Sequence, residues 1–184
     1  MRIAGNKLKR RAQAANVSVE QLAEALVEPG FGAKDAQSAV SNWMAGRDHP
    51  RCRKAHIEKL AKAVGAASKD IAKFTSQVMH HRGSPRKAGL VVDLIRGKSV
   101  EQAEQLLAFS PKRASVDVRK ALLAAREDAM QADADVTALV VTESCVDQGP
   151  RMKRFQPKDR GRAHPIIKAF SHITVSVEEM GPAR

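Results

Sequence analysis

Two strand-like segments enclose the most basic stretch of the chain, and this arrangement limits the folds that the sequence can adopt. Residues 137–147 (TALVVTESCVD) form an apolar run of strand length, and residues 171–179 (SHITVSVEE) alternate apolar and polar side chains. In the second segment the apolar residues are expected to face a core, while Thr174 and Ser176 face outward. The simplest topology is an antiparallel hairpin whose arms, over about residues 147–170, extend past the core.

The stretch between these segments has too much positive charge and too little apolar surface for a core of its own. Residues 149–170 contain one acid, Asp159, against seven basic residues, a net charge of +6. The large apolar residues before Pro165 are Met152 and Phe155. A two-stranded ribbon on its own is marginally stable in water, so the arm needs a partner. Its basic residues are Arg151, Lys153, Arg154, Lys158, Arg160, Arg162 and Lys168.

A phosphate backbone would supply the counter-charge that this arm lacks. Each Lys or Arg docked on a phosphate releases condensed counterions, which makes binding depend steeply on salt. Arg side chains and Phe155 can also stack on unpaired bases. Gly161 permits a turn with positive φ or a close approach to RNA. These features favour RNA binding over the alternative, a solvated loop whose charges serve solubility.

The whole chain is also basic. Its 184 residues carry a net charge of +12, so nucleic acid is the first expected partner and an anionic membrane surface the second. No apolar run reaches the roughly 18 residues that a membrane helix needs, and no signal-peptide pattern follows the basic N-terminus. Two cysteines without a CxxC spacing fit a reducing cytosol. We therefore expect a cytoplasmic protein that does not bind membranes.

No pattern for catalysis or metal binding is found. His80 and His81 are adjacent, and neighbours on a strand point to opposite faces, so they are not expected to chelate one ion. The sequence has no P-loop and no nucleophile elbow. We expect no enzyme, cofactor, metal site or small-molecule substrate. Cys145 should be a small buried strand residue, and Trp43 a core anchor.

The chain divides into an all-α part and an α+β part. Residues 1–75 indicate several short helices, in which Ser18 and Gln21 form a capping box and Ser68 caps a last short turn. Residues 76–184 are expected to begin with a short strand that places Val78 on one face, with His80 as a candidate for the same face.

Three helices follow this strand. The first has Ser84 as N-cap and Pro85 at the first helical position, and it should bury Leu90 and Leu94 along with Val91 and Ile95. The second buries Leu106 among other residues. The third should begin at Ser110–Pro111 and carries an apolar stripe of mainly small residues.

The segments SPRKAGLVVDLIRGKSVEQAEQLLAFSPKRAS and VDQGPRMKRFQPKDRGRAHPIIKAFSHITVSVEE resemble the family of large-subunit ribosomal protein twenty-two. The resemblance runs from about residue 76 to 179. It implies three helices packed on one face of a small antiparallel sheet, with a long projecting β-hairpin. It also implies a structural role in the large ribosomal subunit: binding large-subunit ribosomal RNA, aiding its assembly, and lining the nascent-peptide exit tunnel with the basic hairpin.

The same resemblance implies partners and RNA contacts. The partners are large-subunit ribosomal RNA, neighbouring ribosomal proteins and, near the hairpin tip, the nascent peptide. The contacts at the start of the first helix are Arg82, Ser84, Arg86 and Lys87. Those on the hairpin and at its root are Lys153, Arg154, Lys158, Arg160, Gly161, Arg162, His164, Lys168, Ser171 and His172. The charge and stacking arguments add Arg151 and Phe155.

Residues 1–75 are similar to a second family, the phage-repressor type of helix-turn-helix domain. VSVEQLAEAL is similar to its second helix, and AVSNWMAG followed by LAKAVGAASKDI to its recognition helix and later helices. The segment VEPGFGAKD is longer than the tight turn before such a recognition helix, and no segment reads as a dimerisation element. We therefore expect an appended module held on ribosomal RNA or a neighbouring protein, with a helix-turn-helix DNA-binding transcription regulator as the alternative function.

Overall fold

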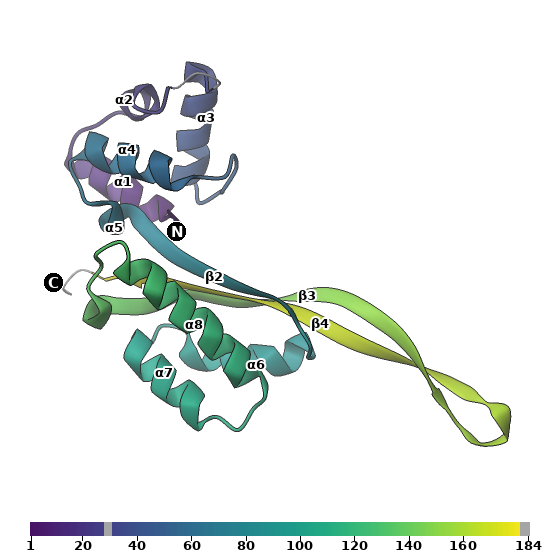
Figure 1. The fold of residues 1–184 in the computed structure, drawn as a ribbon. Coiled ribbons are helices and arrows are strands. Elements are labelled where there is room, and N and C mark those ends of the chain that lie inside the picture. Colours follow the sequence, from purple (N-terminus) through teal and green to yellow (C-terminus); the bar gives the residue numbers. More distant parts are fainter. Residues whose placement is uncertain (28–30, 181–184) are drawn as a thin grey trace. The chain divides into compact units, whose positions relative to one another are not determined.

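The computed structural model describes residues 1–27 and 31–180, which form two compact units. The first unit comprises Met1–Phe74 and Asp128–Asp135, and the second comprises Thr75–Glu127 and the chain from Val136 onward. The strands β1 (Arg2–Ile3), β2 (Ala72–His81), β3 (Leu139–Pro157) and β4 (Ala163–Glu179) form a sheet in the order β1-β2-β4-β3. Figure 1 labels β2, β3 and β4.

The first unit is mainly helical. Its short strand β1 (Arg2–Ile3) pairs antiparallel with the first residues of β2 (Ala72–His81). The helices are α1 (Gly5–Ala14), α2 (Val19–Glu24), α3 (Ala33–Met44), α4 (Lys54–Val64) and α5 (Ser68–Ile71).

Local sequence signals explain several boundaries in this unit. The capping box is confirmed: the Ser18 N–H donates to Gln21 Oε1 at 2.9 Å, and the Gln21 N–H donates to Ser18 Oγ at 3.3 Å. Trp43 is fully buried and its Nε1 donates to the Pro50 carbonyl at 2.7 Å, which confirms it as a core anchor. The predicted cap at Ser68 is wrong, because Ser68 is the first residue of α5 and Ala67 occupies the N-cap position without a side-chain cap.

The segment VEPGFGAKD covers residues 27–35, and its last three residues, Ala33, Lys34 and Asp35, already belong to α3. Its residues Pro29 and Gly30 lie outside the described residues, so the predicted break there is not described. The described parts place the end of α2 at Glu24 and the start of α3 at Ala33.

The second unit has the predicted α+β architecture. Figure 1 shows three helices on one side of a long antiparallel strand pair. The helices are α6 (Pro85–Ile95), α7 (Val100–Phe109) and α8 (Ala114–Met130). The strands are β3 (Leu139–Pro157) and β4 (Ala163–Glu179), joined through the 3-10 turn η2 (Asp159–Gly161), and a further 3-10 turn, η1 (Val136–Ala138), precedes β3.

The core lies between the helices and the inner half of the strand pair. Ile173, Val175 and Val177 are fully buried, as predicted from their alternation. On the adjoining strand the Ser144 hydroxyl donates to the Val92 carbonyl of α6 at 3.1 Å, so this face of the sheet packs on α6. The small-residue stripe of α8 is also buried: Ala114, Val118, Ala121, Leu122, Ala125 and Ala129.

Helix faces and starts differ in part from the prediction. Ser84 and Pro85 begin α6 as expected, but Leu90 and Leu94 are 60% and 41% exposed. The predicted burial of Val91 and Ile95 is confirmed, and Ala88 and Val92 complete the buried face in place of the two leucines. In α7, Leu106 is at the surface, while Val100, Ala103 and Leu107 are buried. Helix α8 begins at Ala114, not at Ser110–Pro111.

The opposite face of β4 is polar but not solvent-exposed. Thr174 and Ser176 are buried, contrary to the prediction that they face outward. The Ser176 hydroxyl lies 2.9 Å from that of Thr75, and Gln77 Nε2 donates to Thr174 Oγ1 at 3.2 Å. Hydroxyl groups can be buried here because β2 supplies hydrogen-bond partners for them.

The end of β2 breaks its own alternation. His80 has φ of +58°, which lies in the left-handed region, and it is exposed. His81 is buried and Val78 is half-buried, and the positive φ of His80 interrupts the alternation from which a shared face for Val78 and His80 was predicted. Cys145 also differs from expectation, because it is only partly buried.

Candidate nucleic-acid interface

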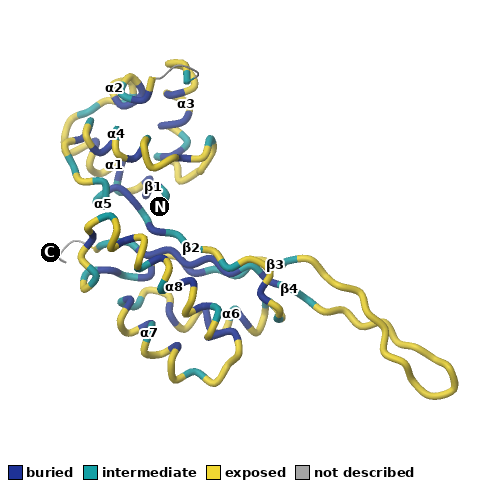
Figure 2. The backbone as a smooth tube through the Cα atoms, in the orientation of Figure 1, coloured by how far each residue is buried: buried dark blue, intermediate teal, exposed yellow. Residues whose placement is uncertain are grey.

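The outer half of the β3–β4 pair projects as a two-stranded ribbon. Its register runs from Arg151 opposite Ala169 to Pro157 opposite Ala163. Every residue from Arg151 to Lys168 is exposed, and Figure 2 shows this change from buried to exposed along the strands. We call the paired residues 151–157 and 163–169, with the turn between them, the finger.

A bulge separates the finger from the core sheet. The strand register shifts between Gln148 and Arg151. Pro150 has no N–H to donate to a ladder, and a Cβ at Gly149 would lie 3.0 Å from the Phe170 carbonyl oxygen. Such a bulge bends the strand and increases its twist, so the sequence Gly149–Pro150 sets where the finger leaves the core.

The register distributes the cations over both faces of the finger. Residues directly opposite each other in an antiparallel pair share a face. One face therefore carries Arg154 and Lys168 together with Met152, Ile166 and His164. The other carries Arg151 and Lys153 together with Phe155, Pro165 and Ile167. Each face presents positive charge beside apolar surface.

The tip is a tight turn that adds three more cations. The Lys158 N–H donates to the Arg162 carbonyl at 2.7 Å across the turn. Gly161 has φ of +71°, which confirms the expected positive-φ turn, and Arg160 also adopts positive φ, at +52°. The side chains of Lys158, Arg160 and Arg162 are exposed around the single acid Asp159.

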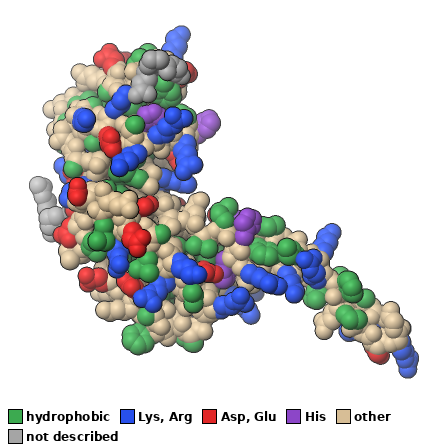
Figure 3. All heavy atoms as spheres, in the orientation of Figure 1, with side chains coloured by type: hydrophobic (Ala, Val, Ile, Leu, Met, Phe, Trp, Pro, Cys, Tyr) green, Lys and Arg blue, Asp and Glu red, His purple; other side chains and the backbone are tan. Residues whose placement is uncertain are grey.

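The charge of the finger is not neutralised by the described part of the protein. In residues 1–27 and 31–180, no salt bridge involves a Lys or Arg between Arg151 and Lys168. Elsewhere in the same unit, Glu104 pairs with Arg119 and Arg126 at 3.0 Å each. Figure 3 shows Lys and Arg side chains along the finger as far as its end.

The two predicted root residues lie in different surroundings. His172 is partly exposed, and its Nδ1 accepts a hydrogen bond from the His80 N–H at 3.1 Å. The imidazole rings of His80 and His172 pack edge to face, with 4.8 Å between their centroids. Ser171 is fully buried and its hydroxyl has no partner among the described groups, so its side chain is not placed to contact RNA directly.

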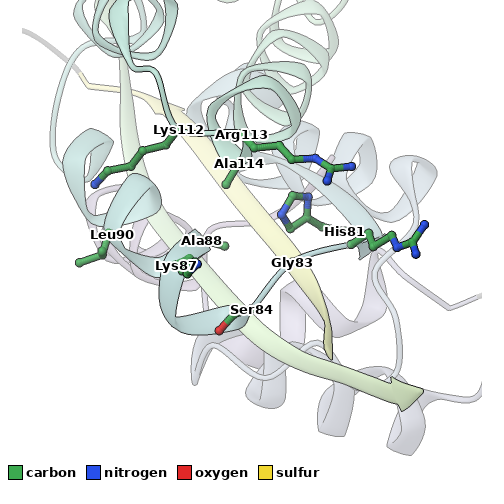
Figure 4. A pocket seen from close by; sticks show the side chains of 10 residues that line it. His81, Gly83, Ser84, Lys87, Ala88, Leu90, Lys112, Arg113 and Ala114 are labelled. Atoms are coloured by element: carbon green, nitrogen blue, oxygen red, sulfur yellow. The ribbon is translucent and has the colours of Figure 1, made fainter. Parts of the chain in front are cut away.

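A second group of cations surrounds the start of α6. Arg82, Ser84, Arg86 and Lys87 are all exposed. A cavity of about 500 Å³ opens here, and it is lined by Arg82, Ser84 and Lys87 but not by Arg86 (Figure 4).

Two cations that sequence reasoning did not select line the same cavity. Lys112 and Arg113 precede α8 and lie across the cavity from α6. A signal for them is present in the sequence, because SPRKA at 84–88 is matched by SPKRA at 110–114. The fold brings these two similar motifs to one cavity.

His81 forms the inner wall of this cavity. Its Nδ1 lies 2.6 Å from Asp117 Oδ2 of α8, and its side chain is 5% exposed. A carboxylate accepts hydrogen bonds, so Nδ1–H donates to Asp117. The contact ties the end of β2 to α8.

Other site types receive no support from the described residues. Within the described ranges, no three His, Cys, Asp or Glu side chains gather in a way that could hold a metal ion. No helix in those ranges is long and apolar enough to cross a membrane.

Comparison with known families identifies the second half of the chain. The family model for ribosomal protein L22p/L17e matches residues 76–178. The chain belongs to this family. A relative, large ribosomal subunit protein uL22 of Magnetococcus marinus, is 52% identical over 99 residues, which cover 53% of this chain and 88% of the relative.

Membership of the L22p/L17e family establishes the general role. The protein is a structural, non-enzymatic component of the large ribosomal subunit, and so belongs to the cytoplasmic ribosome. The match begins at residue 76, so the resemblance of residues 1–75 to repressor-type domains stays a prediction.

Proposed function

We propose that the protein binds large-subunit ribosomal RNA through the finger and the cavity at α6, aids assembly of that RNA, and lines the nascent-peptide exit tunnel with the finger. The observation that carries this proposal is the set of exposed finger cations, which have no acidic partner in the described chain.

RNA on both sides of the finger explains its charge pattern. Arg154 and Lys168 share one face, and Arg151 and Lys153 share the other. A ribbon that met RNA on one side alone would need cations on that side only. Phosphates on both sides would lower the repulsion between these like charges and would order a ribbon that is marginal by itself.

The exposed apolar side chains suit unpaired bases and a peptide. Phe155 is 74% exposed and offers a flat ring for stacking. We assign RNA contacts to the residues predicted from the sequence other than the buried Ser171, with Lys112 and Arg113 added. The nascent peptide would pass near the tip at Arg160 and Gly161.

Residues 1–75 form a separate module in this proposal, and residues 76–184 form the ribosomal domain. The module would sit on ribosomal RNA or a neighbouring ribosomal protein. Family membership of residues 76–178 favours this role over a helix-turn-helix transcription regulator.

The test replaces Arg154, Arg160 and Arg162 by Ala in the full chain and measures binding to large-subunit ribosomal RNA at several salt concentrations. The slope of log affinity against log salt should fall by roughly 2 to 3, since each phosphate contact contributes about 0.7 to 0.9. The melting temperature should stay nearly unchanged, because these side chains are exposed.

The matched control removes the same net charge from exposed positions in the first unit, Lys9, Arg10 and Lys62. An equal loss of affinity in this control would mean that net charge or an RNA contact of the first unit, and not the finger in particular, drives binding. A large drop in melting temperature of the finger variant would mean that the arm packs on its own domain.

A further inference from the structure

The cavity at the start of α6 has the size and the walls of a ligand site. Its volume is about 500 Å³, within the range of roughly 300 to 1,000 Å³ typical of small-molecule pockets. Its lining comes from two segments far apart in sequence, 81–90 and 112–114, held together by the His81–Asp117 contact.

The walls are divided by chemistry. Leu90, which is 60% exposed, provides most of the apolar surface, and Ala88 and Ala114, which are almost fully buried, complete this part of the lining. Arg82, Lys87, Lys112 and Arg113 provide four positive charges around it, and none of them forms a salt bridge among the described residues. A ligand that fits both parts carries a flat or apolar body and a negative group.

His81 adds a fixed polar group to the wall. Because Nδ1–H donates to Asp117, the other ring nitrogen, Nε2, is left for a ligand. A Cβ placed at Gly83 would lie 2.5 Å from Nε2, so glycine leaves this edge of the ring uncovered. No hydrogen-bond partner of Nε2 occurs in the described parts of the chain.

We propose that this cavity holds one unstacked nucleotide of the bound RNA. Its base lies against Leu90, its phosphate lies among the four cations and near the start of α6, and His81 Nε2 accepts a hydrogen bond from a ribose hydroxyl or a base amino group. This assignment rests on the proposed RNA-binding function and names the ligand of one part of that interface.

The test uses the full chain, labelled with ¹⁵N, and follows backbone amide shifts during titration. The probes are inorganic phosphate, adenosine, adenosine 5′-monophosphate and the RNA tetramer ApApApA. The monophosphate should shift the amides of Gly83 and Ala114 and bind at least about fivefold tighter than phosphate, because part of the apolar surface of its base is removed from water against Leu90. The tetramer should bind more tightly than the monophosphate.

A matched pair of variants separates the base site from the phosphate site. Leu90→Ser alters the apolar wall and should remove the advantage of the monophosphate over phosphate. Leu94→Ser changes an exposed leucine one turn further along α6 that does not line the cavity, and it should keep that advantage.

Several outcomes would overturn the assignment. Equal binding of phosphate and monophosphate would leave an anion site without a base pocket, and an equal effect of both Leu variants would place the base elsewhere. Monophosphate binding tighter than the tetramer would point to a free nucleotide instead of RNA. If the monophosphate fails to bind while the finger variant still loses RNA affinity, the pocket assignment fails and the proposed function stands.

Discussion

The same two strands exist in two environments, and the contrast between them shows what each half needs. In the inner half, Leu139–Gln148 pairs with Ser171–Glu179, and Ile173, Val175 and Val177 are fully buried. In the outer half, the finger continues the same ladder with every side chain from Arg151 to Lys168 exposed. Both halves therefore have paired strands, but only the inner half has buried side chains.

Energetics separates the halves in the same way. A backbone hydrogen bond contributes about 1 kcal/mol net, whereas burying one Val or Ile side chain contributes about 1.5 to 3 kcal/mol. The inner half gains both terms and the finger gains only the first. The core thus fixes the register of the finger, and a partner outside the described chain must supply the rest of its order.

The largest effect expected from this contrast concerns two isoleucines of β4. Ile173→Ala should lower the free energy of unfolding by about 3 kcal/mol, because it leaves a cavity in the core. Ile167→Ala, on the finger, should change it by less than about 0.5 kcal/mol, because Ile167 is 59% exposed. Urea unfolding of the full chain followed by circular dichroism measures both, and similar losses would mean that the finger shares the core's stability.

Thiol reactivity gives a second, smaller contrast. Burial, with Asp147 and Glu143 nearby, raises the pKa of Cys145, and burial raises the pKa of Cys52 to about 12, with Asp48 adding to the effect. An Arg154→Cys variant places a thiol on the exposed finger. Because the thiolate is the nucleophile, this cysteine should alkylate at least about tenfold faster than Cys145 at pH 8, with Cys52 slowest, as read by peptide mass spectrometry.

The pH dependence sharpens the thiol test. A raised pKa keeps Cys52 protonated until the pH approaches 12, so its alkylation rate should still be rising above pH 10. Equal rates for the finger cysteine and Cys145 would contradict the difference in environment between the two halves.

The smallest predicted effect lies at the boundary between the halves. Gly149→Ala would place a Cβ 3.0 Å from the Phe170 carbonyl oxygen, and the strand must shift slightly to relieve the contact. We expect a loss of about 1 kcal/mol, with faster amide hydrogen exchange near the bulge. Gly89→Ala is the control, because its added Cβ meets no atom within 4 Å, and an equal loss there would remove the bulge explanation.

Signals that act over a few residues made much of the fold predictable. Ser18 with Gln21, and Ser84 with Pro85, mark helix starts that the structure confirms. The alternation of Ile173, Val175 and Val177 identified the buried face of β4.

The predictions of burial were wrong where contacts with residues far away in the sequence decide which side chains are buried. Leu90 and Leu94 share a helical face just as Val91 and Ile95 do, and only the sheet that packs on α6 selects between the two rows. Thr174 and Ser176 are buried because Thr75 and Gln77 of β2 offer partners, which alternation cannot reveal.

The candidate site follows the same division. The finger could be located from charge and flanking strands alone, but its distribution of cations over two faces required the register. Lys112 and Arg113 were missed because the fold, not the sequence distance, brings them to the cavity at α6.

The bulge at Gly149–Pro150 also governs how such a finger can change length. One residue added to each arm just beyond the bulge would exchange the surroundings of every side chain farther out, because neighbours on a strand point opposite ways. Two residues added to each arm would extend the reach by about 7 Å and leave every side chain oriented as before. Length variants whose finger side chains keep the same neighbours in the ribosome should therefore differ by an even number of residues in each arm.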